Sequence, residues 1–422
     1  MKCEDKKILL ISHNPLSRVN NNGKTLASIF EGVLKSNIYQ IYLNSDIPDY
    51  YDDCHYLQLN EKQIFGSLIG GKNVCCQEVK SIPGKVSSAT IRRGTFGIYT
   101  KRLLRECVWK ITFWKTRLKE WLKDKQFDVV FFMAGDGMFA YDIYRFVMQH
   151  ISAKGCLFFT DDYILGRSSC SPVALLRQSM LKQKIKNVLP ITKELYVISD
   201  EMKEAYTKLF HIEAYVVRNF SVEKVSSGIN QEVVAPNKEI IMIYAGGLHY
   251  NRWQVLSQIA NAIKDFNASN EIKYQLKIYS SQNVSGDIIK EICLDGASEF
   301  CGKATASQIA GIYAGADILL HVESFDKKAI ASTKYSFSTK IPEYLSAGKC
   351  ILAVGPKDVA SIQYLAKVAC TVKNIKEISN TLQDLSDNTY REIIKSKCEE
   401  QYEKDFSEKK HEECLEHILK IL

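Results

Sequence analysis

The chain has 422 residues, more than the ~250 to 300 at which a single hydrophobic core stops growing, so two domains are expected. Apolar residues make up 46% and charged residues 25% of the chain, a composition that excludes a largely disordered protein. The formal net charge of +8 leaves three kinds of partner open: nucleic acid, an anionic membrane surface and a phosphorylated small molecule.

Short β-rich runs alternate with longer helical patterns in the first half of the chain. The strands predicted there cover residues 7–12, 38–43, 128–133, 156–160 and 195–199. This alternation is typical of βαβ units and a mostly parallel sheet. The pattern then lapses into a polar stretch with glycine and proline, so we interpret residues 222–238 as a linker between domains.

The alternation restarts after the linker, with strands predicted over residues 239–245, 274–279, 316–321 and 350–354. The fold class is therefore α/β, with two tandem Rossmann-like, doubly wound domains over residues 1–221 and 239–400. Ligands of such domains bind at the carboxyl ends of the strands, which predicts a site in a central cleft between the domains. Residues 401–422 are helical in pattern and rich in charge, and we expect them to pack back across the domains.

A turn rich in asparagine and glycine follows the first predicted strand. Asn20 to Gly23 can aim backbone amides at an anion, and the helix predicted from Leu26 adds its positive N-terminal end. Such turns also occur for conformational reasons alone, so position leaves both interpretations open.

The second domain opens in the same way, with Gly246 and Gly247 followed by Arg252 and a helix predicted from Trp253. Glycines let a ligand approach the backbone, and an arginine can hold a phosphate through paired, charge-assisted hydrogen bonds. The alternative is an exposed arginine in the first helical turn. The preceding glycine pair favours phosphate binding.

The most informative stretch lies late in the second domain. Ser338, Thr339 and Lys340 are expected at a helix start, with Pro342 in the first turn, where its missing amide hydrogen costs little. The free amides of this turn and the charge of Lys340 suit a diphosphate. Glu343, about one turn further along, can accept hydrogen bonds from a ribose diol.

A strongly basic segment lies in the first domain. Residues 85–125 contain 12 basic and 3 acidic side chains, for a net charge of +9. Apolar residues at helical spacing predict an amphipathic helix. It is either an ordinary domain helix with a solvated basic face, or a surface over residues 91–125 that rests on anionic lipid with the aromatic residues Phe96, Tyr99, Trp109 and Phe113.

The charge excess belongs to the first domain. The first 220 residues hold 32 basic and 22 acidic side chains, net +10, against 24 and 26, net −2, in the remainder. A uniform field that attracts phosphorylated donors is therefore excluded, and a membrane-facing first domain is favoured. No recognised nucleic-acid motif accompanies the basic segment, so nucleic acid is not the expected partner.

Cysteine usage and hydropathy indicate the compartment. The 13 cysteines are odd in number and include no Cys-x-x-Cys, which disfavours a disulfide framework or a zinc site. His411, Cys414 and His417 recur in steps of three that drift around a helix, so no metal is expected there either. No apolar run approaches the ~18 residues that span a bilayer. We expect a cytoplasmic protein, at most peripheral on the inner face of the plasma membrane.

On these residues the chain resembles the two-domain GT-B glycosyltransferases, especially the family 4 branch that builds bacterial polysaccharides and the cell envelope. The resemblance covers nearly the whole length. It is carried by the loop near Gly23, Thr160-Asp-Asp-Tyr163, Val197-Ile-Ser-Asp200 with Val217-Arg-Asn219, Tyr244-Ala-Gly-Gly-Leu248 with Arg252, and Phe337-Ser-Thr-Lys-Ile-Pro-Glu-Tyr-Leu345. The last block is specific, whereas the glycine loops are not.

The resemblance implies transfer of a hexose, with retention and without a metal ion, from a UDP- or GDP-linked sugar to a glycan or lipid-linked acceptor. The donor would lie in the second domain and the acceptor in the first. By the same resemblance, Glu343 would bind the donor ribose and Glu323 would lie beside the transferred sugar. The donor diphosphate would meet Gly23, Gly247, Arg252, Ser338, Thr339 and Lys340.

Two departures from the family pattern concern the reacting centre. The family's usual pair of glutamates is closer in sequence than Glu323 and Glu343, which nineteen residues separate here. Where many members have a histidine, this chain has Asp161 and Asp162. One of these carboxylates could accept a hydrogen bond from a sugar hydroxyl and the other could cap a helix, in either order. Asp136 is a weaker candidate of the same kind.

Two other functions remain alternatives at this point. A sugar-nucleotide 2-epimerase has the same two-domain fold but changes the donor without an acceptor. A non-catalytic basic binding protein would use the basic segment alone.

Overall fold

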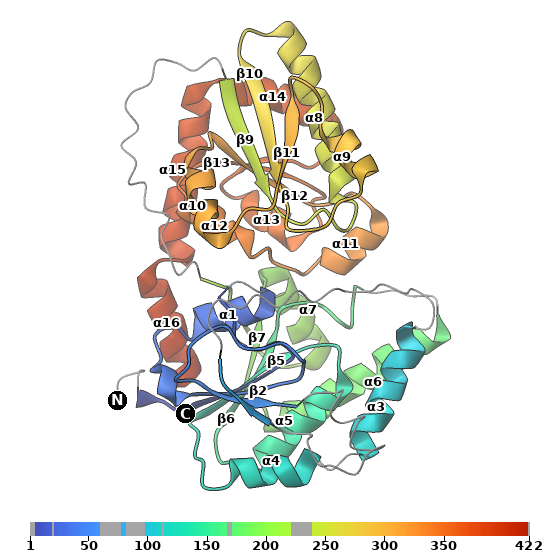
Figure 1. Ribbon diagram of the computed structural model, residues 1–422, viewed down its shortest axis with the longest axis vertical. Coiled ribbons are helices and arrows are strands. Elements are labelled where there is room, and N and C mark those ends of the chain that lie inside the picture. Colours follow the sequence, from blue (N-terminus) through green and yellow to red (C-terminus); the bar gives the residue numbers. More distant parts are fainter. Residues whose placement is uncertain are drawn as a thin grey trace. The chain divides into compact units, whose positions relative to one another are not determined.

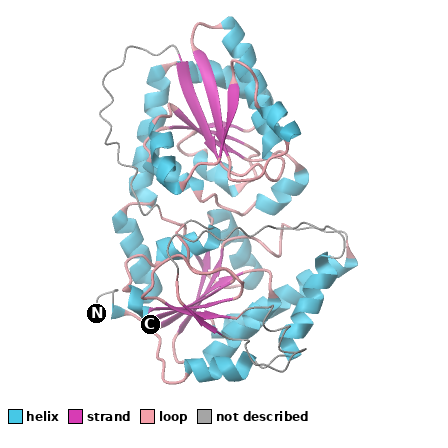
Figure 2. Ribbon diagram, viewed as in Figure 1, coloured by secondary structure: helices cyan, strands magenta, loops and turns pink. Residues whose placement is uncertain are grey.

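The structure is a computed structural model, and its described part comprises residues 5–18, 21–59, 77–81, 98–111, 114–166, 171–220 and 239–420. The chain divides into two compact units. Unit 1 consists of residues 1–219 and 411–422, and unit 2 of residues 220–410. In each unit a sheet packs against helices (Figure 1, Figure 2).

Unit 1 contains an eight-stranded sheet in the order β4-β3-β2-β1-β5-β6-β7-β8. Its strands are β1 (Ile8–Ser12), β2 (Ile38–Tyr42), β3 (His55–Gln58), β4 (Gln77–Val79), β5 (Val129–Ala134), β6 (Lys154–Phe159), β7 (Glu194–Val197) and β8 (Ala214–Val216). Neighbouring strands are parallel except for the β3–β4 pair. Strands β1 and β5 are buried along their whole length, which explains their continuous apolar sequences.

The helices of unit 1 surround this sheet. They are α1 (Asn21–Ile29), α3 (Ile98–Ile111), α4 (Trp114–Leu122), α5 (Met138–His150), α6 (Pro172–Val188) and α7 (Asp200–Phe210), with 3-10 turns η2 (Lys35–Asn37) and η3 (Leu189–Ile191). Helices α3, α4, α5 and α6 pack together (Figure 1). Ser199 caps α7 by accepting a hydrogen bond from the Met202 amide, as the preference for serine at this position predicts.

The C-terminal end of the chain is fastened to unit 1 by a buried lysine. Lys154 Nζ donates to the backbone carbonyls of His417, Ile418 and Lys420 at 3.2, 3.1 and 3.0 Å and pairs with Glu194 at 2.7 Å. These carbonyls lie at the end of helix α16 (Glu408–Leu419), where a cation is favoured by the helix dipole.

The two C-terminal histidines have separate partners. His411 Nε2 lies 2.9 Å from the Ile29 carbonyl oxygen, and the His417 ring lies 4.9 Å from that of Tyr215. Among the described residues, no group of three or more His, Cys, Asp or Glu side chains is arranged to hold a metal ion.

Unit 2 contains a six-stranded, wholly parallel sheet in the order β11-β10-β9-β12-β13-β14. Its strands are β9 (Glu239–Ala245), β10 (Lys273–Tyr279), β11 (Ser298–Gly302), β12 (Ile318–Val322), β13 (Cys350–Val354) and β14 (Cys370–Val372). Its helices are α8 (Arg252–Ser269), α9 (Gly286–Ile292), α10 (Ala306–Ala314), α11 (Lys327–Thr333), α12 (Lys340–Ser346), α13 (Ala360–Leu365), α14 (Ile378–Ser386) and α15 (Asn388–Asp405), with the 3-10 turn η4 (Ile375–Glu377).

Both sheets have a topological switch point, where the order of successive strands reverses direction. In unit 1 it lies between β1 and β5, and in unit 2 between β9 and β12. The loops after these two strands diverge to opposite sides of the sheet and leave a crevice at the carboxyl ends, where α/β proteins bind ligands. The residues that follow β1, β5, β9 and β12 are therefore the ones positioned to form sites.

The basic segment is helical over its described part, as its pattern predicts. That part comprises helices α3 and α4, and residues 85–97, 112 and 113 lie outside it. The apolar side chains of α4, Trp114, Leu118 and Leu122, are buried, because they pack into unit 1.

The aromatic residues expected to rest on lipid are accounted for only in part. Trp109 is buried, and its ring stacks on Phe139 at 4.3 Å. Phe96, Phe113 and the side chain of Tyr99 lie outside the described part. The exposed side chains of α3 and α4, and of the turn after α4, include Lys110, Lys115, Arg117, Lys119 and Lys123.

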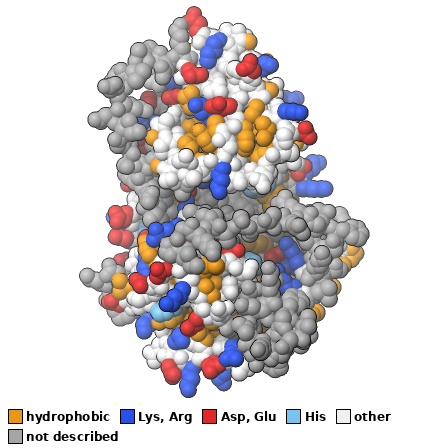
Figure 3. Space-filling view, in the orientation of Figure 1, with side chains coloured by type: hydrophobic (Ala, Val, Ile, Leu, Met, Phe, Trp, Pro, Cys, Tyr) orange, Lys and Arg blue, Asp and Glu red, His pale blue; other side chains and the backbone are white. Residues whose placement is uncertain are grey.

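The described part of the chain contains no helix that is both long enough and apolar enough to cross a membrane. On the face of the molecule shown in Figure 3, Lys and Arg side chains are interspersed with Asp and Glu side chains. That face therefore carries no field of a single sign over its described surface.

Candidate functional site

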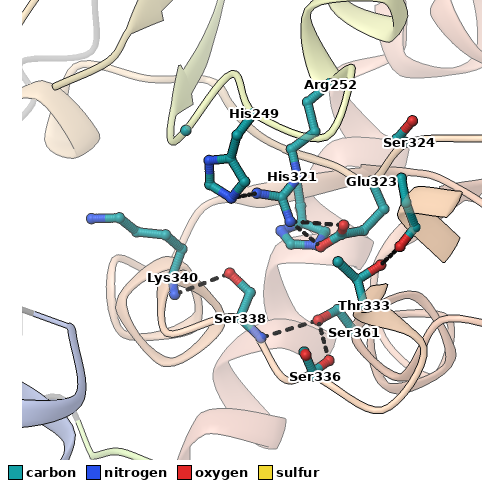
Figure 4. A network of polar contacts seen from close by, with 12 residues as sticks. His249, Arg252, His321, Glu323, Ser324, Thr333, Ser336, Ser338, Lys340 and Ser361 are labelled. Carbon is teal, nitrogen blue, oxygen red and sulfur yellow. Dashed lines mark hydrogen bonds and ion pairs between the residues drawn. The ribbon is translucent and has the colours of Figure 1, made fainter. Parts of the chain in front are cut away.

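The switch point of unit 2 holds a buried ion pair between the first residue of α8 and the residue after β12. Arg252 Nη2 donates to both carboxylate oxygens of Glu323, at 2.9 and 2.8 Å (Figure 4). The two side chains are only 16% and 4% exposed. Arg252 is therefore not the exposed first-turn arginine of the alternative interpretation.

A glycine makes room for Glu323. The Glu323 amide donates to the Val354 carbonyl at 2.8 Å, which holds it beside the end of β13. A Cβ atom on Gly355 would lie 2.7 Å from the Cβ of Glu323, closer than side chains approach one another. Only glycine fits at residue 355 while Glu323 keeps this position.

The charge of Glu323 is fixed by its surroundings. Burial alone would raise its pKa, but the positive charge of Arg252 and the neighbouring His321 outweigh burial and lower the pKa to about 2. His321 Nε2 lies 3.4 Å from Glu323 Oε1. The carboxylate is therefore ionised across the physiological pH range and holds Arg252 in one orientation.

The loop between β9 and α8 is fastened by a histidine and a glutamine. His249 Nε2 lies 3.4 Å from Arg252 Nη1, and His249 Nδ1 lies 2.9 Å from Gln282 Nε2. Gln282 Oε1 accepts from the Leu248 amide at 2.9 Å. A Cβ on Gly247 would lie 2.4 Å from His249 Nδ1, so a larger residue here would displace the His249 ring.

A second ion pair lies at the start of α12, where the sequence predicts a helix start. Lys340 Nζ is 3.0 Å from Glu343 Oε2, and the side chains are 34% and 14% exposed. The Tyr313 hydroxyl lies 3.4 Å from the same carboxylate oxygen. Lys340 thus keeps solvent-accessible surface while its charge is held next to Glu343.

The turn before α12 is held by serines. Ser338 donates its amide to Ser361 Oγ at 3.0 Å, and its own hydroxyl oxygen accepts from the Lys340 amide at 3.3 Å (Figure 4). Thr339 is the N-cap residue of the helix. The predicted helix start at Ser338 to Lys340 is therefore confirmed, and the role of these residues in binding a diphosphate stays a prediction.

The two aspartates after β6 have different surroundings. The Asp162 carboxylate, 3% exposed, accepts from the amides of Ile164 and Leu165 at 3.0 Å and from the Tyr206 hydroxyl at 3.0 Å. It also accepts from the Gly166 amide. These bonds occupy both oxygens and give Asp162 a role in holding this loop, and which of the two aspartates faces the reaction stays a prediction.

Gly23 also has a packing reason to be glycine. Helix α1 begins at Asn21 rather than near Leu26, which places Gly23 in its first turn. A Cβ at this position would lie 2.2 Å from the Pro15 carbonyl oxygen. The contact of the Gly23 amide with a diphosphate stays a prediction.

The structure brings the predicted donor residues of unit 2 together in two pairs, Arg252 with Glu323 and Lys340 with Glu343. The predictions at Gly23, Asp161 and Asp162 fall in unit 1. Sequence reasoning missed three side chains that contact these pairs, which are His249, Tyr313 and His321, and also Gln282, which holds His249. Only His249 had a signal, because it lies inside the glycine loop before Arg252.

The chain is similar to known proteins in its structure. No family model and no curated protein matches the chain. Solved structures do match it over nearly its whole length, including a trehalose 6-phosphate synthase from Burkholderia multivorans at 8% identity and a TM-score of 0.62, covering 98% of this chain and 96% of that one. The fold is that of the GT-B glycosyltransferases.

Two further structures are similar to the same extent. A UDP-forming α,α-trehalose-phosphate synthase from Burkholderia xenovorans, in complex with glucose-6-phosphate, is 9% identical with a TM-score of 0.61 and covers 98% and 100% of the two chains. HepE from Anabaena, in complex with UDP, is 12% identical with a TM-score of 0.60 and covers 98% and 99%. At these identities the likeness establishes the GT-B fold alone.

Proposed function

We propose that the protein is a glycosyltransferase that moves a hexosyl group from a nucleoside-diphosphate sugar to a glycan or lipid-linked saccharide in cell-surface polysaccharide synthesis. One observation carries the proposal. The buried Arg252–Glu323 pair lies at the switch point of unit 2, where α/β sheets bind their ligands.

Glycosyl transfer requires cations at the site that holds the donor diphosphate. Breaking the bond between the sugar and the diphosphate builds negative charge on the leaving phosphate and oxocarbenium character on the sugar, so fixed cations lower the barrier. The Nε of Arg252 is buried and has no hydrogen-bond partner among the described residues. Arg252 therefore retains a donor for a phosphate oxygen while Glu323 holds its orientation.

The remaining roles follow from the same arrangement. Lys340, partly exposed at the start of α12, would neutralise the second phosphate, and Glu343 would accept hydrogen bonds from the ribose diol. Asp161 would accept a hydrogen bond from the acceptor hydroxyl. We propose UDP as the nucleotide, since two structures of the same fold are described as UDP-forming or as a complex with UDP. The proposed transfer proceeds with retention and uses no metal ion.

A nucleotide-sugar panel tests this function. The protein is incubated with UDP- and GDP-linked hexoses without an acceptor, and slow release of the nucleoside diphosphate is measured. We expect one donor to be hydrolysed, and this activity to be lost in Lys340→Ala. An epimerised donor with no release, or no turnover of any donor, would overturn the proposal.

We also propose peripheral contact with an anionic membrane through residues 91–125. The exposed lysines around α4 support this contact, and the burial of Trp109 and Trp114 makes it electrostatic rather than insertional. Co-sedimentation with phosphatidylserine vesicles that weakens with salt, and none with phosphatidylcholine vesicles, is expected. Equal binding to both kinds of vesicle would contradict it.

A further inference from the structure

The switch point of unit 1 is surrounded by arginines from two helices. His13 follows β1 and Asp136 follows β5, while α3 supplies Arg102 and Arg105 and α6 supplies Arg177. Helices α3 and α6 pack side by side (Figure 1). Part of the basic segment therefore points to this crevice rather than to the outer surface.

We propose that Arg102, Arg105 and Arg177 form a binding site for a phosphate or diphosphate group carried by the sugar acceptor. This inference rests on the proposed glycosyl transfer and names the class of its acceptor.

The contacts of Asp136 show how the arginines converge. Arg102 Nη1 lies 2.6 Å from Asp136 Oδ2, and Arg177 Nη2 lies 3.5 Å from the same oxygen. Arg177 Nη2 also donates to the Asp136 carbonyl oxygen. One carboxylate is thus shared by two guanidinium groups from different helices.

Arg177 is the buried member of the cluster. Its side chain is 7% exposed, and its Nε has no hydrogen-bond partner among the described residues. A buried guanidinium N–H without a partner costs free energy that an anionic oxygen would recover. The same feature distinguishes Arg252 at the switch point of unit 2.

The charges of the cluster do not balance. Glu106 is buried, and both of its carboxylate oxygens accept amides at the start of α5, from Met138 and Phe139, at 2.8 Å. Its negative charge is therefore directed at the helix start. Three arginines and the two carboxylates leave a net charge of +1.

The arginines repel one another, which is seen in the pKa of Arg177. Burial lowers the pKa of Arg177, and the charges of Arg102 and Arg105 lower it further, against the opposing effect of Asp136 and Glu106. An anion in the crevice would relieve this repulsion.

The chemistry favours a phosphate over other anions. Guanidinium groups form paired hydrogen bonds with the planar edge of two phosphate oxygens, and several together match a doubly charged group. The Arg105 guanidinium lies 4.7 Å from the Phe139 ring centroid, and this contact orients the guanidinium plane.

Binding of pyrophosphate and of glucose 6-phosphate, measured by calorimetry without any nucleotide sugar, tests the proposal. Hydrogen exchange of residues 98–111 and 135–139 separates this site from the donor site in unit 2. We expect added anion to protect these segments. Tighter binding of pyrophosphate would indicate a lipid-diphosphate acceptor, and tighter binding of glucose 6-phosphate a soluble sugar phosphate.

Two variants move the affinity in opposite directions. Arg102→Gln, at a partly exposed position, should weaken anion binding roughly tenfold, as expected for one lost charge-assisted hydrogen bond. Asp136→Asn removes the competing carboxylate and should strengthen binding severalfold. Arg145→Gln, an exposed arginine of α5 in the same unit, is the control and should leave affinity unchanged.

The outcomes separate this inference from the proposed function. A merely structural cluster would lose stability in Asp136→Asn without gaining affinity, and that result would overturn the inference. Absent protection of residues 98–111 would do the same. Anion binding at this site together with no turnover of any nucleotide sugar would instead overturn the proposed transfer and leave an anion site in unit 1.

Discussion

The switch points of the two units have the same backbone topology but opposite patterns of charge pairing. In unit 2 each cation has its own carboxylate, Arg252 with Glu323 and Lys340 with Glu343. In unit 1 two arginines share Asp136. Topology therefore determines where a site forms, whereas a few side chains after the strands determine which charge it attracts.

The largest expected effect comes from breaking the buried pair of unit 2. Glu323→Ala should reduce the free energy of unfolding by about 3 to 5 kcal/mol, because it leaves a buried arginine without a partner. The double variant Arg252→Met with Glu323→Leu should recover most of that stability while nucleotide binding stays absent. Urea unfolding and calorimetry measure the two properties. A single variant as stable as the natural protein would show that the pair is solvated.

Lowering the pH should remove the stability that the Arg252–Glu323 pair contributes. The Glu323 pKa is lowered from 4.5 to about 2, so its contribution to stability is complete above the unfolded value and is lost as the pH falls from about 4.5 to about 2. Unfolding free energies over this range should fall more steeply in the natural protein than in the Arg252→Met, Glu323→Leu double variant. Equal slopes would contradict the lowered pKa.

Substitutions of Asp161 and Asp162 in unit 1 should differ in their effects on stability and on turnover. Asp162→Ala leaves three amides and the Tyr206 hydroxyl without their acceptor, and should reduce the free energy of unfolding by about 1 to 3 kcal/mol. Asp161→Ala should reduce turnover and cost less stability than Asp162→Ala. Thermal unfolding paired with the donor-release assay distinguishes the two. A loss of stability as large in Asp161→Ala as in Asp162→Ala would contradict this difference.

A smaller effect is expected where glycine makes room for the buried pair. Gly355→Ala forces a Cβ against Glu323 and should cost about 1 to 3 kcal/mol, the usual penalty for overpacking. Gly286→Ala is the control, because nothing lies within 4 Å of a Cβ at that position. Equal unfolding midpoints in the two variants would show that Glu323 can move aside.

Most of the fold could be predicted from the sequence because its central strands are buried on both faces. Strands β9 and β13 begin and end where the apolar runs predict them. The missed strands are β3, β4, β8, β11 and β14, of which β3 is next to a sheet edge and the other four lie at the edges. Strand β4 has the sequence Gln-Glu-Val, and no periodicity identifies three such residues.

The site was predictable as a set of residues but not as a set of contacts. The helix start within Ser338 to Glu343 could be predicted because it depends on residues that are neighbours in the sequence. The pairing of Arg252 with Glu323 joins residues 71 positions apart, and no local pattern encodes it. The two interpretations of the basic segment stayed open for a related reason, since spacing alone does not tell that Trp109 packs into the core.

Unit 2 is proposed to bind a nucleoside diphosphate through Arg252 and Lys340. A calorimetric titration of UDP into the natural protein, Lys340→Ala and Lys290→Ala tests it most directly, since Lys290 is an exposed lysine of the same unit. We expect binding that weakens roughly tenfold or more in Lys340→Ala, from the loss of a charge-assisted contact, and is unchanged in Lys290→Ala. Equal affinity in all three proteins, or no binding of UDP or GDP, would contradict it.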